Sequence, residues 1–572
     1  MKHYLKVLFI ALSLLFVVSL FKNISYPLFW ADESMTVMHG KRVLEYGYPK
    51  VHDGKNVLYD LRHPNPTLGV DERTDAFIGG ANWGQYYIAA VGVKMAEMSD
   101  DLYTKTGIIR SLFALIGFAG LAIFAWLTSR FFRRGLSRTV FLALFAFLEL
   151  ISVPLVLHLR EARYYPLTVF GVAFAVCVYT RYRLLNKTGY LSFLVLLIVS
   201  LLLVFILFSP AFFILAAAIF LFESIMFAKR LLFQHQGTRG EAMPSPSTLK
   251  ELFRDYVMGT LPLFLSLITL YPLMIFFKVS SIAEEMARFN TLSSNMDSLH
   301  MYLDNLSIIW RYFASFDLLY LALLLKVGLL CYCALKLADK SLPPCDVPKM
   351  TISNFLAILF IVYFFAIAKI PNFLFMRYYI PLQPVLALII ILDVAVLYNI
   401  FSRYHLPLIY RNGLVALFIG LMISNISNNL EFIKGHVYEL SHPYKGPLDY
   451  VIPFIREKYT NTDGLVIATN YEETSFMYYL DSKVIVGFVG NNLEEDSRAV
   501  PDIIVYRKPW GQFGELFSTF IGKGQYSRIS FPSVDFPTNN ISELNWSPPF
   551  IHRFRTPATD DERARVDIFL RM

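Results

Sequence analysis

Residues 190–222 read YLSFLVLLIVSLLLVFILFSPAFFILAAAIFLF and contain no charged side chain. A helix that crosses a bilayer needs roughly 20 consecutive apolar residues, so this run is long enough for more than one crossing. Ser209-Pro210 divides it, because proline ends one helix and suits the first turn of the next. The stretch therefore predicts two membrane helices joined by a tight hairpin.

The rest of the chain has the same character. Of its 572 residues 56% are hydrophobic and only 17% are charged, with a mean hydropathy of +0.49. We predict a polytopic α-helical membrane protein with about eleven spans, judged by the length of each apolar run. The expected spans lie near 5–22, 107–129, 139–158, 164–181, 190–208, 210–228, 257–278, 313–337, 353–369, 378–400 and 407–425.

Basic residues indicate the orientation. The net charge of +8 is concentrated in short segments between spans, namely 130–138, 181–187 and 228–233, as the positive-inside rule expects of cytoplasmic loops. Anionic lipid headgroups are the expected partners of these loops, and we expect no nucleic acid. The N-terminus is then cytoplasmic and, because no cleavage site follows it, is retained as the first span.

This orientation places the loops 23–106 and 279–312 and everything after about 426 outside. We divide the chain into a transmembrane domain, 1–429, with the long external loop 23–106, and an external α/β domain, 430–572. Helical and strand-like segments alternate in the second domain, as in small α/β folds. They are GPLDYVIPFIREKY, GLVIAT, YEETSFMYYL, KVIVGFV and DIIVY. We expect an integral protein of a bacterial inner membrane, with this domain in the periplasm.

The long external loop carries two expected helices. Residues 33–46 read as a helix that stops at Gly47, and residues 84–98 as a helix along the membrane surface. The stretch PLFWADESMTV, 27–37, places Asp32 and Glu33 close to the end of the first span. Asp32 could cap the helix, with both acids at its positive end. Alternatively, partial desolvation could make a general base at the membrane surface.

Cations collect at the external ends of other spans. Such residues often only extend their charged ends to lipid headgroups. Here they stand in tight turns beside Tyr and Pro, and converging there they would bind an anion such as a lipid phosphate. The candidates are Arg110, Arg160, Arg163, Lys369 and Arg377, with Glu161 and Tyr164 as neighbours in the same segment.

Four segments resemble one family. FWADE, TGIIRSLFALIGFAG, HLREARYYPLTVF and MRYYIPLQPVLAL are similar to the pattern of C-type (GT-C) glycosyltransferases, nearest to the protein O-mannosyltransferase and lipid A aminoarabinose transferase group. The resemblance covers about residues 1–425 and, more loosely, the C-terminal domain. It implies a GT-C-like fold and an enzyme that transfers a hexosyl or pentosyl group.

In that family the sugar arrives on a polyprenyl phosphate, and an external acid deprotonates the acceptor while the anomeric carbon inverts. The resemblance thus implies Asp32 as the base, Glu33 as its support, and the arginines as phosphate ligands. The acceptor would be a lipid, a glycan or a protein. The family's His-Pro-Pro or Lys-Pro-Pro element is replaced by RHPNPTLG, where Arg62 or His63 could supply the cation.

We expect no metal ion and no other cofactor. The loop segment VDERTD, 70–75, lacks an Asp-x-Asp pair, and the cysteines show no zinc or disulfide spacing. The four cysteines are Cys177, Cys331, Cys333 and Cys345.

A transporter or a flippase of lipid-linked substrates is the alternative. Glu149, Lys326 and Asp393 fall inside expected spans, where ionisable residues often mark ion or proton pathways. They could instead pair as structural locks, Lys326 with either acid. Transport would leave the long external loop and the external domain without a role.

Overall fold

The computed structural model describes most of the chain. The described residues are 2–58, 69–79, 83–133, 135–185, 189–236, 246–281, 298–338, 346–369, 376–403, 408–443, 445–485, 498–508, 518, 520–535 and 561–572.

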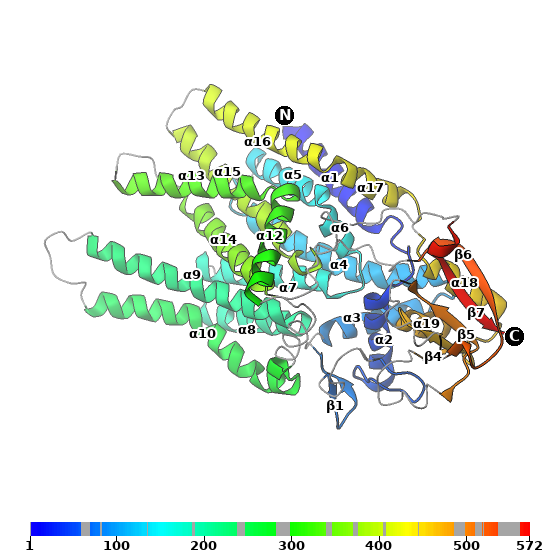
Figure 1. The fold of residues 1–572 in the computed structure, drawn as a ribbon. Coiled ribbons are helices and arrows are strands. Elements are labelled where there is room, and N and C mark those ends of the chain that lie inside the picture. The colour runs from blue at the N-terminus through cyan, green and yellow to red at the C-terminus, as the bar shows by residue number, and fades with distance from the viewer. Residues whose placement is uncertain are drawn as a thin grey trace.

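Long helices packed side by side form the larger part of the molecule (Figure 1). Within the described residues, nine helices are long and apolar enough to cross a membrane, or up to eleven if each of two bent pairs is one span. This confirms the prediction of a polytopic helical protein with about eleven spans. The helices are α1 Lys2–Phe21, α4 Leu102–Ser129, α5 Leu136–Ile151, α6 Val153–Leu159, α7 Tyr164–Val178 with the π-helix η2 Tyr179–Leu184, α8 Tyr190–Leu207, α9 Ser209–Gln236, α10 Pro246–Phe276, α12 Ser298–Phe316, α13 Leu319–Ala338, α14 Val347–Ile367, the short 3₁₀ helix η3 Met376–Tyr379, α15 Leu382–Arg403, α16 Leu408–Asn428 and α17 Leu430–Ser441.

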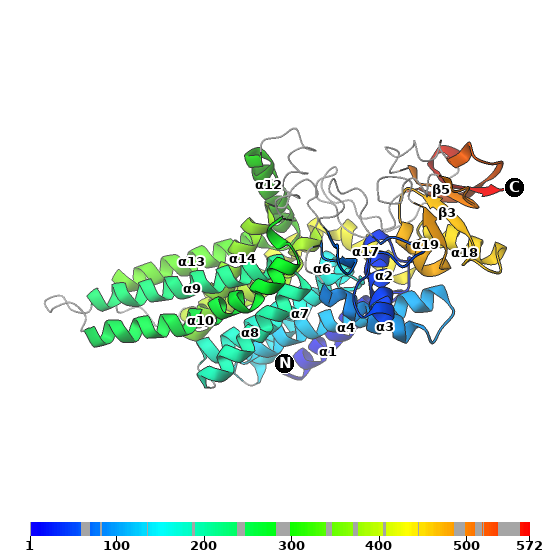
Figure 2. The ribbon, with the colours of Figure 1, turned by 90° about the horizontal axis from the view of Figure 1, so that it is seen from below.

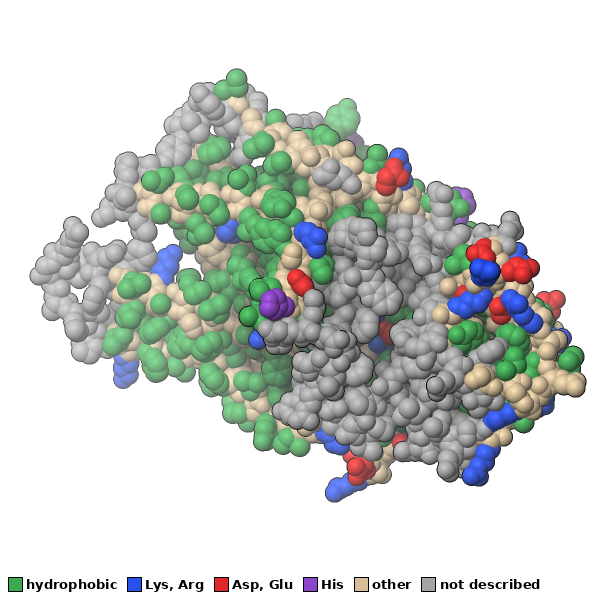
Figure 3. Space-filling model, viewed as in Figure 1, with side chains coloured by type: hydrophobic (Ala, Val, Ile, Leu, Met, Phe, Trp, Pro, Cys, Tyr) green, Lys and Arg blue, Asp and Glu red, His purple; other side chains and the backbone are tan. Residues whose placement is uncertain are grey.

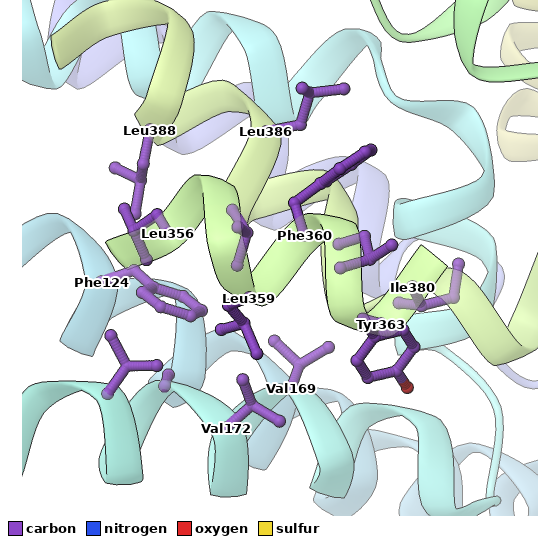
Figure 4. Close-up of a cluster of buried hydrophobic side chains, with 14 of the residues drawn as sticks. Phe124, Val169, Val172, Leu356, Leu359, Phe360, Tyr363, Ile380, Leu386 and Leu388 are labelled. Carbon is purple, nitrogen blue, oxygen red and sulfur yellow. The ribbon is translucent and has the colours of Figure 1, made fainter. Parts of the chain in front are cut away.

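The centre of the bundle is a continuous apolar core. Side chains from α4, α7, α14 and α15 interlock there (Figure 4), among them Phe124, Val172 and Leu359. Gly120 permits the close approach of α4 to α7, because a Cβ at this position would lie 2.8 Å from the backbone of Phe170. Hydrophobic side chains also cover the outer surface of the bundle, whereas charged ones gather over the C-terminal strands (Figure 3). This distribution suits a bundle surrounded by lipid.

Two expected spans are broken. The span predicted over 139–158 bends by 79° between α5 and α6, because Pro154 at the start of α6 cannot continue the helix of α5. The span predicted over 313–337 is also two helices, since Leu318 takes a left-handed conformation (φ 60°) between α12 and α13. Figure 2 shows α12 standing steeply away from α13. Neither break interrupts the apolar pattern that the span prediction used.

The loop 23–106 contains two helices beside the end of α4. They are α2 Ala31–Tyr46 and α3 Trp83–Ala96, close to their predicted limits, and a small hairpin of β1 Val70–Asp71 and β2 Ala76–Phe77 lies between them in sequence. Gly47 ends α2 in the left-handed conformation (φ 84°), as expected. Gly40 lets α3 pack against α2, since a Cβ there would lie 2.8 Å from Ala89.

The C-terminal segment forms a mixed sheet with helices. The strand order is β4-β3-β5-β7-β6, with β3 parallel to both β4 and β5, and β7 antiparallel to β5 and β6. The predicted α/β character is confirmed, although β6 and β7 were not predicted. The elements are α18 Leu448–Lys458, β3 Val466–Thr469, α19 Glu473–Leu480, β4 Lys483–Ile485, β5 Ile503–Tyr506, β6 Tyr526–Val534, the 3₁₀ turn η5 Glu562–Ala564 and β7 Arg565–Arg571.

Candidate active site

The first turn of α2 carries the two acids. Trp30 is the residue that precedes the helix and it makes no side-chain cap, so the expectation that Asp32 caps α2 is wrong. The Asp32 carboxylate instead accepts a hydrogen bond from Nη1 of Arg377 at 2.8 Å and lies 3.5 Å from Nη2 of Arg163. A quarter of its side chain is exposed. Asp32 is therefore partly open to solvent.

Glu33 lies in a different environment although it is the next residue. Its side chain is fully buried, and its two oxygens accept from Nε and Nη2 of Arg110 at 2.8 and 2.5 Å. The backbone N–H of Ala162 also donates to Glu33, at 2.8 Å. Arg110 uses its remaining nitrogen on the carbonyls of Ile24 and Pro27. This buried fork joins α2 to α4 and to the turn before α7.

The arginines that hold Asp32 lie among aromatic rings. The Arg377 guanidinium lies 5.7 Å from the centre of the Trp30 ring and 5.9 Å from that of Tyr165. Burial alone would lower the pKa of Arg377, but Tyr165, Tyr378 and Asp32 raise it above its ordinary value. Both Arg377 and Arg163 keep nine-tenths of their side chains from solvent. The site therefore presents two permanent positive charges of low hydration.

Arg160 and Glu161 face a small cavity behind this site. The cavity has a volume of about 30 Å³ and is also lined by Glu33, Arg110 and Glu439. Arg160 donates to the carbonyl of Lys22 at 2.7 Å, and burial lowers its pKa to about 10. Burial and the nearby Glu33 raise the pKa of Glu161 well above its usual range. Arg160 and Glu161 thus line this cavity together with Glu33 and Arg110.

The remaining candidates are placed as follows. Tyr164 stacks on Phe208 with ring centres 4.7 Å apart and lies under the guanidinium of Arg163. Lys369 is exposed and the structure brings it to no acid among the described residues. Arg62 and His63 lie outside the described residues. Among those that are described, no three His, Cys, Asp or Glu side chains are grouped to hold a metal ion.

Thr36 and the C-terminal helix α19 are parts of the site that the sequence did not indicate. The Thr36 hydroxyl accepts from Nη1 of Arg163 at 2.9 Å, and its spacing of four residues from Asp32 puts both on one face of α2. Ser475 of α19 donates to the carbonyl of Phe29 at 2.7 Å, and the Phe29 N–H donates to Tyr479 at 3.0 Å. The C-terminal domain thus clamps the segment that carries Asp32.

An apolar groove lies beside the cationic site. It has a volume of about 420 Å³ and is formed by α3, α8 and α10, with Trp83, Leu207 and Phe277 in its wall. Phe208, which follows Leu207, stacks on Tyr164 next to Arg163. One wall residue of the groove is therefore the chain neighbour of a residue that packs against Tyr164.

Of the three intramembrane candidates, Lys326 and Asp393 form an ion pair of 2.9 Å. Ser353 also donates to Asp393, at 2.6 Å. Glu149 is not part of this pair and lies in a separate cavity.

No protein-family model and no curated protein matches the chain. Among solved structures the chain is similar to the oligosaccharyltransferase of Archaeoglobus fulgidus with a tethered acceptor peptide that contains an NVT sequon. The identity is 12% and the TM-score 0.48, over 99% of this chain and 77% of that one. The apo form of that enzyme gives a TM-score of 0.44 at 12% identity, over 94% and 74% of the two chains. A likeness of this size does not by itself define a family or an activity.

Proposed function

We propose that the protein is a membrane glycosyltransferase that moves a single sugar from a polyprenyl-phosphate donor to an acceptor hydroxyl. The observation that carries this proposal is one partly exposed carboxylate, Asp32, shared between two buried arginines, Arg163 and Arg377. Transfer from a phosphate lipid needs a base for the acceptor and positive charge for the departing phosphate. The site holds both within one cluster.

The reaction is a single displacement. The acceptor oxygen forms a bond to the anomeric carbon on the face opposite the phosphate, and the bond from that carbon to the phosphate oxygen breaks. The acceptor proton passes to Asp32, and the electron pair of the broken bond leaves with the polyprenyl phosphate. Arg163 and Arg377 stabilise that departing dianion, and one such preorganised donor contributes about 3–4 kcal/mol to lowering the barrier. The sugar inverts its configuration.

Donor binding also prepares the base. A carboxylate held by two guanidinium groups is a weak base, because their charge stabilises its ionised form. When the donor phosphate takes over hydrogen bonds from Arg163 and Arg377, Asp32 loses those stabilising contacts and becomes a better proton acceptor. The resting ion pairs therefore keep the base inactive until the donor is bound.

The apolar groove suits the lipid part of this donor. Its wall of Trp83, Leu207 and Phe277 can bury an isoprenoid chain at about 25 cal/mol per Å² of apolar surface removed from water. The Phe208–Tyr164 stack connects this wall to Arg163. A polyprenyl tail in the groove would place its phosphate at the arginines.

Transport is less well supported. Lys326 and Asp393, two of its three candidate residues, are joined as an ion pair and to Ser353. Such an ion pair holds helices together. A transport function would also leave the Asp32 cluster without a role. We therefore assign the pair a structural role.

Binding of polyprenyl phosphate tests the proposal without knowledge of the sugar. Trp30 beside Arg377 and Trp83 in the groove provide intrinsic fluorescence signals. Purified protein in lipid nanodiscs should bind polyprenyl phosphate much more tightly than the matched polyprenol, and Arg377→Ala should remove most of that preference. Equal binding of the two lipids, or an unchanged preference in Arg377→Ala, would contradict the proposal.

The sugar and the acceptor need a second experiment. Mass analysis of cell-envelope glycans, lipids and proteins, with and without the protein, should reveal one missing hexosyl or pentosyl group. An envelope that is identical in both strains would argue against the transfer.

A further inference from the structure

A second polar cavity lies within the bundle, away from Asp32. It has a volume of about 30 Å³ and lies between the end of α5, the turn from α12 to α13, and the helices α15 and α16. Space of this size accommodates one or two particles as large as a water molecule. Its polar lining consists of Glu149, Ser152, Asp317, Gln383 and Asn425.

Several oxygen atoms of the lining have no hydrogen-bond partner among the described residues. Glu149 is 3% exposed, and neither carboxylate oxygen has a hydrogen-bond partner among the described residues. Gln383 is 4% exposed and donates its amide N–H to Asp317 at 3.3 Å, which leaves its own Oε1 without a donor. The Ser152 hydroxyl is also unpartnered. Asn425 uses its N–H₂ on the carbonyl of Ser315 at 3.0 Å.

No positive side chain balances the two acids. Within the described residues, neither Glu149 nor Asp317 forms an ion pair with Lys, Arg or His. Glu149 is buried and Asp317 is partly buried, and a buried carboxylate is costly unless it is paired, neutralised or bound to a metal. Ser152 stands at the 79° break between α5 and α6, and broken membrane helices are sites at which cations are coordinated.

We propose that this cavity binds a hard metal cation of the Na⁺ or Ca²⁺ type. Its ligands are the carboxylates of Glu149 and Asp317, Oε1 of Gln383 and the hydroxyl of Ser152, an all-oxygen set of the kind that such cations prefer. The proposal does not depend on the glycosyltransferase assignment.

The position of the cation explains what it stabilises. Ser152 directly precedes α6, which leads into the turn with Arg163, and Gln383 lies in the first turn of α15, shortly after η3 with Arg377. A cation held by both segments would fix the broken helix relative to α15. The cation would therefore stabilise the two segments that position Arg163 and Arg377.

Thermal unfolding of the full-length protein in detergent provides the first test. The salts are NaCl, CaCl₂ and MgCl₂, with choline chloride at matched ionic strength as reference. The assay is run at alkaline pH, because a carboxylate binds a cation in its ionised form. Na⁺ or Ca²⁺ should raise the unfolding temperature in a saturable way, as a ligand of the folded state does. If no salt exceeds choline, the proposal is overturned.

Variants assign the effect to this cavity. Glu149→Gln keeps the shape but removes a charged ligand. Residues that only orient a metal ligand contribute about 10–100-fold to metal affinity. Glu149 is proposed as a direct ligand, so Glu149→Gln should weaken equilibrium binding of radiolabelled Na⁺ or Ca²⁺ at least about tenfold. Ser152→Ala should weaken it less, in the same direction. Asp304→Asn, at an exposed acid of α12, is the matched control. Equal affinity in Glu149→Gln and Asp304→Asn would overturn the assignment.

Discussion

At the scale of single residues, Asp32 and Glu33 show how burial separates two neighbouring acids. Successive residues of a helix point about 100° apart, so one carboxylate faces the open site and the other faces α4. The sequence predicted a site that contains both acids and the arginines, because their charges stand at span ends. It could not predict which arginine meets which acid, since those contacts join residues far apart in the chain.

Glu33→Gln should destabilise the protein. The change leaves the buried Arg110 without its charged partner, and removing one member of a buried ion pair costs about 3–5 kcal/mol. Chemical unfolding in detergent micelles measures the loss. Asp32→Asn is the matched control and should cost less, because a quarter of Asp32 is exposed. Similar losses in both variants would contradict the distinction between a structural and a reactive acid.

Because His39 is buried, we expect the free energy of unfolding to fall in acid. Burial, together with the charges of Arg42 and Arg163, lowers the pKa of His39 to about 3. Between this value and the unfolded pKa of about 6.5, the unfolded chain binds a proton that the folded one does not, so stability falls as the pH falls. At about pH 5 the cost is about 2 kcal/mol.

His39→Phe should remove this acid-dependent loss. The ring of His39 stacks on Phe77 at 4.8 Å and lies tilted against Tyr86 at 4.6 Å, and neither nitrogen has a hydrogen bond among the described residues. Unfolding temperatures from about pH 7.5 to 5 test this prediction, with the exposed His442→Phe as control. The same acid sensitivity in His39→Phe and the wild type would contradict it.

At the scale of elements, most helices of the bundle could be predicted from the length of apolar runs. The helices α2 and α3, predicted from their amphipathic pattern and, for α2, the stop at Gly47, match within two residues at each end. The breaks after α5 and α12 could not, because hydropathy remains high across them. The contact of α19 with the segment before Asp32 could not be predicted either, because Phe29 and Tyr479 are 450 positions apart. A local sequence pattern does not indicate a contact between residues so far apart.

Tyr479→Phe should weaken this clamp. It leaves the buried N–H of Phe29 without an acceptor, which costs about 1–3 kcal/mol. Donor turnover should fall with it, since the segment before Asp32 is less well held. Tyr478→Phe is the neighbouring control, because its hydroxyl has no hydrogen bond among the described residues. Equal stability and turnover in the two variants would remove the positioning role of α19.

At the scale of the whole molecule, apolar composition was sufficient to predict a bundle of membrane helices. The alternation of helical and strand-like segments after residue 430 was sufficient to predict the α/β domain that follows. The two C-terminal strands β6 and β7 escaped prediction. Their register pairs Phe531 with Val566. These residues are far apart in the sequence, so local patterns do not indicate that they pair. The Lys326–Asp393 pair, one of two alternatives from the sequence, is the one that the structure contains.

This pair separates catalysis from transport. Lys326→Met alone should destabilise the bundle by leaving Asp393 buried without its cation, whereas Lys326→Met with Asp393→Leu should restore much of the stability. If the pair is structural, the double variant should keep its turnover and its donor binding. A stable double variant without activity would instead favour an ion pathway.

The central claim is that Asp32 accepts the proton of the acceptor, and turnover by Asp32→Asn tests it most directly. With the labelled donor and acceptor that the envelope analysis identifies, turnover should fall about 10²–10⁴-fold, the usual contribution of a general base. Polyprenyl phosphate should bind as tightly or more tightly, because Arg163 and Arg377 no longer hold a competing carboxylate. Turnover at the wild-type rate in a folded Asp32→Asn protein would contradict the account.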